Sequence, residues 1–343
     1  MQYRRLGKSG LLVSELSIGT NMFGGGDLPG WKALGGLEQP ECNAIIKHAF
    51  DKGINFIDTA DTYAAGQSEQ RVGQAIRDVG LNRNDVVIMT KTAGRMRPTP
   101  NAIGASRGYL MSAVDDSLKR LNTDHIDVYL IHHFDAATPL EESLRALDDI
   151  VRSGKVRYVG CSNFAGWQVA KALGISERKN YARFDAIEAQ WSIITRDIER
   201  EVVPMGIDLG VGILVWAPLV SGLLTGKYDR EGKSGATGRL GGKVPATLNA
   251  DKVFDVIDAM RPIAKAHDAT VGQIAIAWLL HQKGTTSVIF GSRNAAQFDE
   301  NCAATDIKLT ADELATLDKV SALPPEYGMA MVQGTRTDRA RYA

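Results

Sequence analysis

The sequence predicts an α/β fold in which eight parallel strands alternate with helices and close into a (β/α)8 barrel. Short apolar runs alternate with amphipathic helical stretches, a pattern typical of βαβ units and a parallel sheet. The apolar runs number eight, which suits a closed barrel. The chain has 343 residues, of which 44% are hydrophobic and 23% charged. These values fit one barrel domain spanning residues 1–343.

The elements are expected in a regular order. Tyr3–Arg5 and Leu11–Val13 flank the turn residues Gly7–Gly10, which predicts an N-terminal β-hairpin that could plug the bottom of the barrel. The eight barrel strands are expected at Leu16–Ile18, Ile54–Asp58, Val86–Lys91, Ile126–His132, Val156–Ser162, Ala186–Gln190, Gly212–Trp216 and Ser287–Phe290. Helical stretches between them include Glu38–Asp51, Ser68–Arg77, Ala105–Leu121, Pro139–Val151 and Trp167–Gly174.

Two long loops are expected on the C-terminal face of the barrel. Residues 225–247 are rich in glycine and charge, and residues 95–106 form a second stretch without periodicity. Loops of this length often cover a ligand. The tail beyond Pro324 has no usable pattern.

An open, doubly wound sheet is the structural alternative. Such a sheet binds dinucleotides through a GxGxxG turn that opens a helix, but no helical pattern follows Gly24–Gly26. Polar candidates also follow several different strands, which is where a barrel gathers its site. The barrel is therefore the favoured prediction.

The composition argues against several functions. Lys plus Arg and Asp plus Glu number 40 each, so no nucleic-acid partner is expected. Cys42, Cys161 and Cys302 lack CxxC spacing, so neither a disulfide framework nor a metal site is expected. The N-terminus lacks a signal-peptide core, and no apolar run of about 18 residues exists. A cytoplasmic protein without a membrane partner is expected, either a monomer or a homo-oligomer.

Four polar side chains follow apolar runs and point to chemistry. Asp58 ends one run and Tyr63 comes five residues later, while Lys91 and His132 end the next two runs. On a barrel these strand ends meet at the C-terminal mouth. Each residue alone has an ordinary structural explanation, such as a helix N-cap for Asp58 or a solvated surface position for Lys91. The combination is what indicates a catalytic site.

The four residue types together suit proton donation to a carbonyl. A phenol has a pKa of about 10 in water. A neighbouring ammonium lowers that pKa, and a carboxylate keeps the ammonium charged. A histidine can hydrogen-bond the substrate oxygen. Such a set serves as a general acid for a carbonyl that receives a hydride, and the hydride has to come from a cofactor.

The chain resembles the aldo-keto reductase family from Tyr3 to about Ala322. The segments that carry the resemblance are Asn55–Tyr63, Thr90–Lys91, Leu130–His132, Gly160–Phe164, Ala189–Ser192, Trp216–Leu219 and Gly291–Asn294. The resemblance implies a (β/α)8 barrel, NAD(P)H bound across the carboxyl ends of the strands, and reversible reduction of an aldehyde or ketone. It implies Tyr63 as proton donor, with Asp58, Lys91 and His132 as its partners.

The resemblance also implies the cofactor contacts. Ser162, Asn163 and Gln190 would bind the carboxamide, and Trp216 would stack on the nicotinamide. The pyrophosphate would lie on Leu219, Ser221 and Lys227, and the adenosine 2′-phosphate and adenine on Gly291, Ser292, Arg293, Gln297, Glu300 and Asn301. Further contacts are expected from Gly19, Thr20, Asn21, Asp58, Ala217 and Pro218. The Arg293 guanidinium and a helix beginning near Asn294 both suit a phosphate, which favours NADPH over NADH.

Some positions depart from the commoner family pattern. Trp216 stands where many members have Tyr, and Phe290 where a Pro often precedes the glycine. His133 follows His132, so the choice of His132 rests on the motif. Apolar residues of the first loop, Met22, Phe23 and Trp31, could line the substrate pocket.

Two functional alternatives remain. One is a slow-turnover NADPH-binding regulatory subunit resembling potassium-channel β subunits, which share the fold and the tryptophan. The other is an alcohol dehydrogenase that runs the same reaction backwards with NADP⁺.

Overall fold

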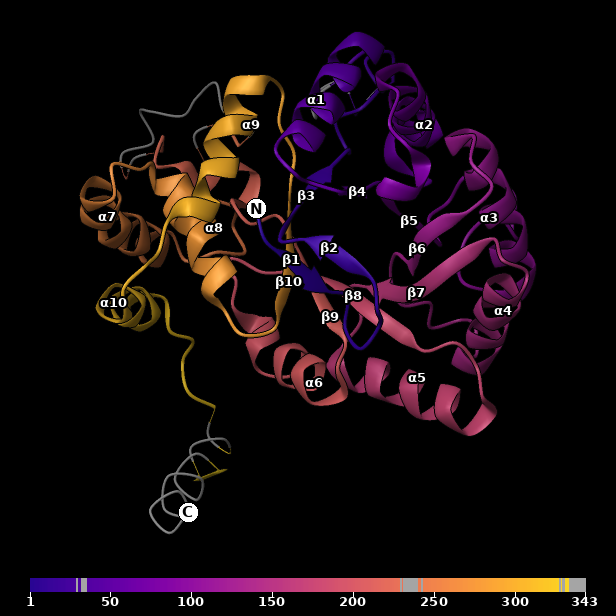
Figure 1. Cartoon of the computed structure of the whole chain (residues 1–343). Helices are drawn as coiled ribbons and strands as arrows, with labels where there is room; N and C mark the ends of the chain where they lie inside the picture. The colour runs from indigo at the N-terminus through magenta and orange to yellow at the C-terminus, as the bar shows by residue number, and fades with distance from the viewer. Residues whose placement is uncertain are drawn as a thin grey trace.

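A closed barrel of eight parallel strands forms the centre of the molecule (Figure 1). The computed structural model describes residues 1–28, 30, 31, 36–228, 230, 240, 241, 243–326, 328, 331 and 332. The barrel strands are β3 (Leu16–Gly19), β4 (Phe56–Asp58), β5 (Val87–Thr92), β6 (Ile126–Ile131), β7 (Val156–Ser162), β8 (Phe184–Gln190), β9 (Gly212–Trp216) and β10 (Thr285–Phe290). The last strand pairs back onto the first, Val288 opposite Leu16. The predicted fold is confirmed, and the predicted strand ends differ from these by at most two residues.

Helices surround the barrel in the described part of the chain (Figure 1). They are α1 (Gln39–Asp51), α2 (Gln67–Val79), α3 (Arg107–Leu121), α4 (Leu140–Arg152), α5 (Gly166–Lys179), α6 (Val202–Leu209), α7 (Ala250–Ala266), α8 (Val271–His281), α9 (Ala295–Cys302) and α10 (Ala311–Ser321). The predicted helix near Asn294 begins at Ala295, since the Asn294 side chain accepts a hydrogen bond from the Gln297 amide. Helix α5 runs past its predicted end because Ile175 continues the buried face, and it stops where Asn180 turns to φ 56°.

The long loops differ in how much of them the structure describes. Residues 95–106 have no regular secondary structure, as predicted. The predicted loop 225–247 lies partly outside the described residues. In the described part of the chain, no helix is long and apolar enough to cross a bilayer.

The N-terminal hairpin closes the amino end of the barrel. Its strands are β1 (Tyr3–Arg5) and β2 (Leu12–Ser14). Leu6 and Val13 pack against the side chains that fill the barrel, among them Phe56 and Leu130. Gly7 has φ +58°, and a Cβ there would lie 2.4 Å from the Asp185 carbonyl oxygen, so only glycine fits this close approach. The predicted plug is therefore confirmed, and one end of the barrel is filled.

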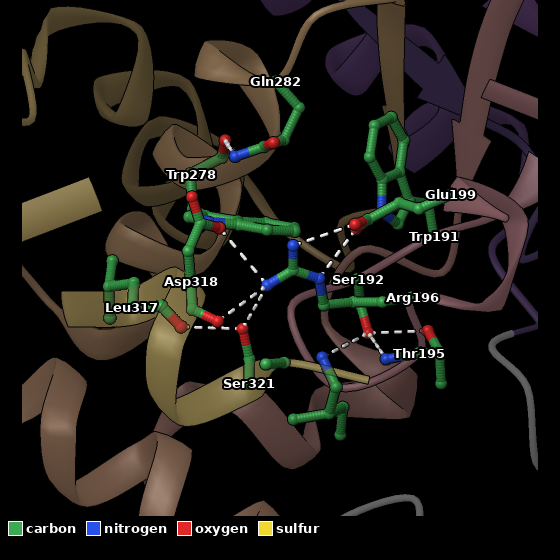
Figure 2. Close-up of polar contacts among 12 residues, drawn as sticks. Trp191, Ser192, Thr195, Arg196, Glu199, Trp278, Gln282, Leu317, Asp318 and Ser321 are labelled. Atoms are coloured by element: carbon green, nitrogen blue, oxygen red, sulfur yellow. Dashed lines mark hydrogen bonds and ion pairs between the residues drawn. The ribbon is translucent and has the colours of Figure 1, made fainter. Parts of the chain in front are cut away.

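A cluster around Arg196 ties α10 to α8 and to the turn after β8 (Figure 2). Arg196 follows β8 and donates two hydrogen bonds of 2.8 Å to Glu199 in η3 (Asp197–Glu199). It donates a further bond of 2.6 Å to Ser321 of α10. Its guanidinium carbon lies 5.0 Å from the ring centroid of Trp278 in α8. One side chain thus joins three separate elements.

Candidate active site

A cavity of about 570 Å³ opens among the carboxyl ends of the strands. It brings together most of the side chains predicted for the site. The predicted residues that line it are Gly19, Asn21, Asp58, Tyr63, His132, Asn163, Trp216, Ala217, Pro218, Leu219, Ser221, Lys227, Gly291, Arg293, Gln297 and Asn301. Met22, expected from the first loop as a pocket residue, also lines it, and so do residues that were not predicted: Glu188, Gly222, Thr225, Ile289 and Phe290.

Other predicted residues lie behind the lining. Thr20, Lys91, Ser162 and Ser292 are buried next to it, and Gln190 and Glu300 are not among the described residues that line it. The Ser68 hydroxyl lies 2.9 Å from the Thr20 hydroxyl and 2.9 Å from the Thr59 hydroxyl. These hydroxyls brace the end of β4 against α2.

Lys91 is fully buried and lies at the centre of the charged groups. Its ammonium contacts the Asp58 carboxylate and donates a 3.1 Å hydrogen bond to the Thr59 carbonyl. The same nitrogen lies 3.0 Å from Oε2 of Glu188 and 5.1 Å from the ring centroid of Tyr63. The barrel produces this grouping because β4 and β5 are neighbours and Glu188 points inward from β8 across the barrel.

Tyr63 begins the turn η1 (Tyr63–Gly66) between β4 and α2. Ala64 and Ala65 follow it with φ of 49° and 53°. A left-handed backbone is unfavourable for alanine, so this turn is held by its surroundings. The Tyr63 ring meets His132 edge-on at 5.8 Å and Trp31 at 6.2 Å between centroids.

The pKa of the Tyr63 phenol is raised above its usual value. Burial is the largest cause, and the Asp58 and Glu188 carboxylates add to it. Lys91 lowers the pKa as the sequence predicted, but burial outweighs it. The expectation of a lowered phenol pKa is therefore wrong for this site, and Tyr63 holds its proton firmly.

His132 is held in its neutral form. Burial, with Lys91 and His133 adding to it, lowers the pKa of His132 to about 3. The His132 ring lines the cavity. The His133 ring, whose centroid lies 6.3 Å from that of His132, is not among the described lining residues. The geometry therefore favours His132 of the two, as the motif suggested.

Glu188 is the acidic residue that sequence reasoning missed. Burial, together with the Asp58 carboxylate, raises its pKa to about 7, although Lys91 acts in the opposite direction. Glu188 precedes Gln190 by two residues, so strand alternation places both on the same face of β8. That alternation is the signal in the sequence that could have revealed it.

Asn163 connects the charged centre to Trp216. Its φ is +58°, a conformation that Asn tolerates better than most residues. Its Nδ2 donates to the His132 carbonyl at 3.1 Å and to the Ser162 hydroxyl at 3.0 Å. Its Oδ1 accepts a 3.1 Å hydrogen bond from the Trp216 indole. Ser162, which is buried behind the cavity lining, thus helps to position the Asn163 side chain.

The far part of the cavity has cationic and backbone groups suited to phosphates. In η4 (Val220–Thr225), Ser221 and Gly222 have φ of 55° and 86°. A Cβ on Gly222 would lie 3.1 Å from the Lys227 ammonium, so this lysine reaches back over the turn. Arg293 lies just before α9, where free helix amides attract anions. Phe290 packs its ring 5.2 Å from that of Phe298 in α9, which anchors the segment.

The comparisons with known proteins agree with this geometry. Residues 15–322 match the model of the aldo/keto reductase family. A probable voltage-gated potassium channel subunit beta of Arabidopsis thaliana is 36% identical over 313 residues, covering 90% of this chain and 92% of the relative. The versiconal hemiacetal acetate reductase of Aspergillus parasiticus is 33% identical over 339 residues, covering 93% and 96%. An uncharacterized oxidoreductase of Bacillus subtilis (strain 168) is 33% identical over 331 residues, with the same coverage. The chain therefore belongs to the aldo/keto reductase family of oxidoreductases, whose members act on carbonyl compounds.

Proposed function

We propose that this protein reduces an aldehyde or ketone with NADPH, and that Tyr63 gives the proton to the carbonyl oxygen. The observation that carries the proposal is the contact set in one cavity: Tyr63 lies between His132 and the Lys91–Asp58 ion pair. The same cavity continues to Lys227 and Arg293.

The residues present fit a dinucleotide. The Trp216 indole offers a flat surface for a nicotinamide, and Oδ1 of Asn163 can accept one further hydrogen bond, from a carboxamide NH2. The left-handed turn at Ser221 and Gly222 with Lys227 would hold the pyrophosphate, and Arg293 the 2′-phosphate. When bound, the cofactor supplies a hydride, which side chains cannot provide.

The chain's own residues manage the proton. The Tyr63 phenol carries its proton at neutral pH, as an ordinary phenol with a pKa of about 10 does, and so it can donate to a carbonyl oxygen. Burial raises the pKa of this phenol and opposes donation, whereas the neighbouring Lys91 acts in the opposite direction. The Lys91 ammonium stabilises the phenolate that donation leaves, and Asp58 keeps that ammonium charged. Neutral His132 presents a ring nitrogen that can hydrogen-bond the substrate oxygen and fix its position.

The test is Tyr63→Phe, which removes the proton donor and keeps the ring. We expect the rate of NADPH oxidation with a panel of aldehydes and ketones to fall by about 10²-fold or more. Binding of NADPH, followed by quenching of tryptophan fluorescence, should be unchanged. Tyr129→Phe is the matched control, since it removes another buried phenol, in the barrel wall, and should keep full activity. Full activity in Tyr63→Phe would contradict the proposed role, and running NADH in parallel tests the preference for NADPH.

A second candidate function is a cofactor-binding regulatory subunit. The observation that favours it is the similarity to proteins named probable potassium channel β subunits in Arabidopsis thaliana and Oryza sativa subsp. japonica. Tight NADPH binding without turnover of any carbonyl compound in the panel would support this candidate over the reductase. Oxidation of alcohols with NADP⁺ is the same chemistry in reverse and is measured with the same variants.

A further inference from the structure

Glu188 is a buried carboxylate in the cavity, and the proposed proton transfer does not use it. The residue is 3% exposed, it lines the cavity, and its Oε2 has no aligned hydrogen-bond partner among the described residues. A buried carboxylate without full pairing is costly. A structural role is therefore a poor explanation for a charge at this position.

The local charge balance is unequal. Asp58 and Glu188 share the single ammonium of Lys91, so the three groups carry one net negative charge when both carboxylates are ionised. His132 is neutral and Tyr63 is protonated, and neither compensates that charge. A cationic ligand part beside Glu188 would compensate it.

Glu188 also lies close to the groups that suit a nicotinamide. Its backbone carbonyl accepts a 3.0 Å hydrogen bond from the backbone N–H of Asn163. It pairs with Leu214 on β9, and Trp216 is two residues further along the same face of that strand. The carboxylate thus lines the same cavity as the proton-donor group and the aromatic surface.

We propose that Glu188 is a specificity residue, whose carboxylate makes the site prefer the oxidised, positively charged nicotinamide over the neutral reduced form. This inference rests on the proposed function, because it needs a nicotinamide cofactor in the cavity. An opposite charge stabilises a cation at short range in a buried site, whereas a neutral ring gains nothing comparable. The preference favours the oxidised cofactor on the enzyme and so pulls the bound equilibrium toward carbonyl reduction.

The preference depends on the protonation of Glu188. The charged and titratable groups that face it are Lys91 from β5, Asp58 from β4 and Tyr63 from η1, with His132 beside Tyr63. The neighbouring strands contribute Ser162 and Leu214 opposite Glu188, which do not titrate in this range. The carboxylate is ionised above its pKa of about 7. The preference for the oxidised cofactor is therefore full above that pH and is lost as the pH falls below it.

The experiment measures the dissociation constants of NADP⁺ and NADPH separately, by tryptophan fluorescence, from about pH 5.5 to about pH 9. Both cofactors carry the same 2′-phosphate, so its titration cancels in the ratio of the two constants. In the wild-type protein we expect the ratio to shift about tenfold toward NADP⁺ across this range. In Glu188→Gln, which keeps the shape and removes the charge, the ratio should stay flat at the low-pH value.

Asp185→Asn is the matched control, because Asp185 lies on the same strand and outside the described lining of the cavity. It should keep the wild-type pH dependence. A pH-independent ratio in the wild-type protein, or a pH dependence that persists in Glu188→Gln, would overturn the inference while leaving the proposed function intact. Failure of the wild-type protein to bind either cofactor would overturn both. A flat ratio in the wild-type protein overturns the inference without any variant, so the test survives even if Glu188→Gln folds poorly.

Discussion

At Lys91, one ammonium keeps two carboxylates buried inside a barrel. Lys91→Met would leave Asp58 and Glu188 without a cation, and we expect the free energy of unfolding to fall by about 3–5 kcal/mol at neutral pH. Without the cation the folded-state pKa of both carboxyls rises further. The folded variant tolerates both carboxyl groups when they are protonated at low pH, and it loses free energy of unfolding as they ionise with rising pH. Urea denaturation should therefore show a smaller difference from wild type near pH 5 than near pH 8.

Lys171→Met is the control for that measurement, since Lys171 lies on the surface in α5 and should change little at either pH. Adding Glu188→Gln to Lys91→Met should restore part of the loss, because one uncompensated charge is removed. An equal loss at both pH values would show that the lysine acts by packing and not by charge.

In the proposed function, Arg293 makes the site prefer NADPH, which carries a 2′-phosphate, over NADH, which does not. Its guanidinium can form paired hydrogen bonds with a phosphate, and it lines the cavity just before α9. Arg293→Ala should weaken NADPH binding by about ten- to a hundredfold, the size of one or two charge-assisted hydrogen bonds. NADH, which lacks the 2′-phosphate, should bind with nearly unchanged affinity. Equal weakening of both cofactors, measured by fluorescence titration, would contradict this role.

At the scale of elements, Arg196 fastens α10 to α8 and η3. Its side chain is 11% exposed, bonded to Glu199 and Ser321, and stacked on Trp278, as Figure 2 shows. Arg196→Ala should lower the free energy of unfolding by about 2–3 kcal/mol, because it removes the cation that pairs with Glu199, the donor to Ser321 and the stacking on Trp278. Glu199 and Ser321 keep one hydrogen bond each, to Trp191 and to the Leu317 carbonyl. Denaturation in urea measures this loss.

Arg200→Ala provides the comparison for Arg196. Arg200 also carries an ion pair, with Glu326, but its side chain is more exposed. Exposed pairs contribute little, so this variant should change stability by less than about 1 kcal/mol. Similar losses in the two variants would show that burial and stacking add nothing at Arg196.

The sequence predicted the strands well because each is an apolar run bounded by turn residues. Burial on both faces makes such runs nearly continuous, as in Val156–Ser162, whose bounds were predicted without error. Ends were less certain where apolar residues continue beyond the paired segment, as at Ile54, which is buried but precedes β4. Backbone pairing, which the sequence does not show, sets those limits.

At the scale of the whole molecule, the grouping of the proposed catalytic residues was predictable and their electrostatics were not. Strand ends and the family motif place Asp58, Tyr63 and Lys91 at one mouth. The pKa of Tyr63 depends on how deeply the ring is buried, which only packing determines. Glu188 was missed because Gln190 in the same strand drew the cofactor role, and both face the same side. Which of two alternate residues reaches a cavity is a three-dimensional property.

The barrel can close only after its last strand, β10, has been synthesised. Strand β3 begins at Leu16 but pairs with β10, and Arg4 donates a 2.7 Å hydrogen bond to the Thr285 carbonyl. At about 5–20 residues per second, a ribosome needs roughly 15–60 s to synthesise the intervening segment. During that interval the first strand has one unpaired edge and the hairpin has no docking surface. We therefore expect the nascent N-terminal half to expose this strand edge until β10 has been synthesised.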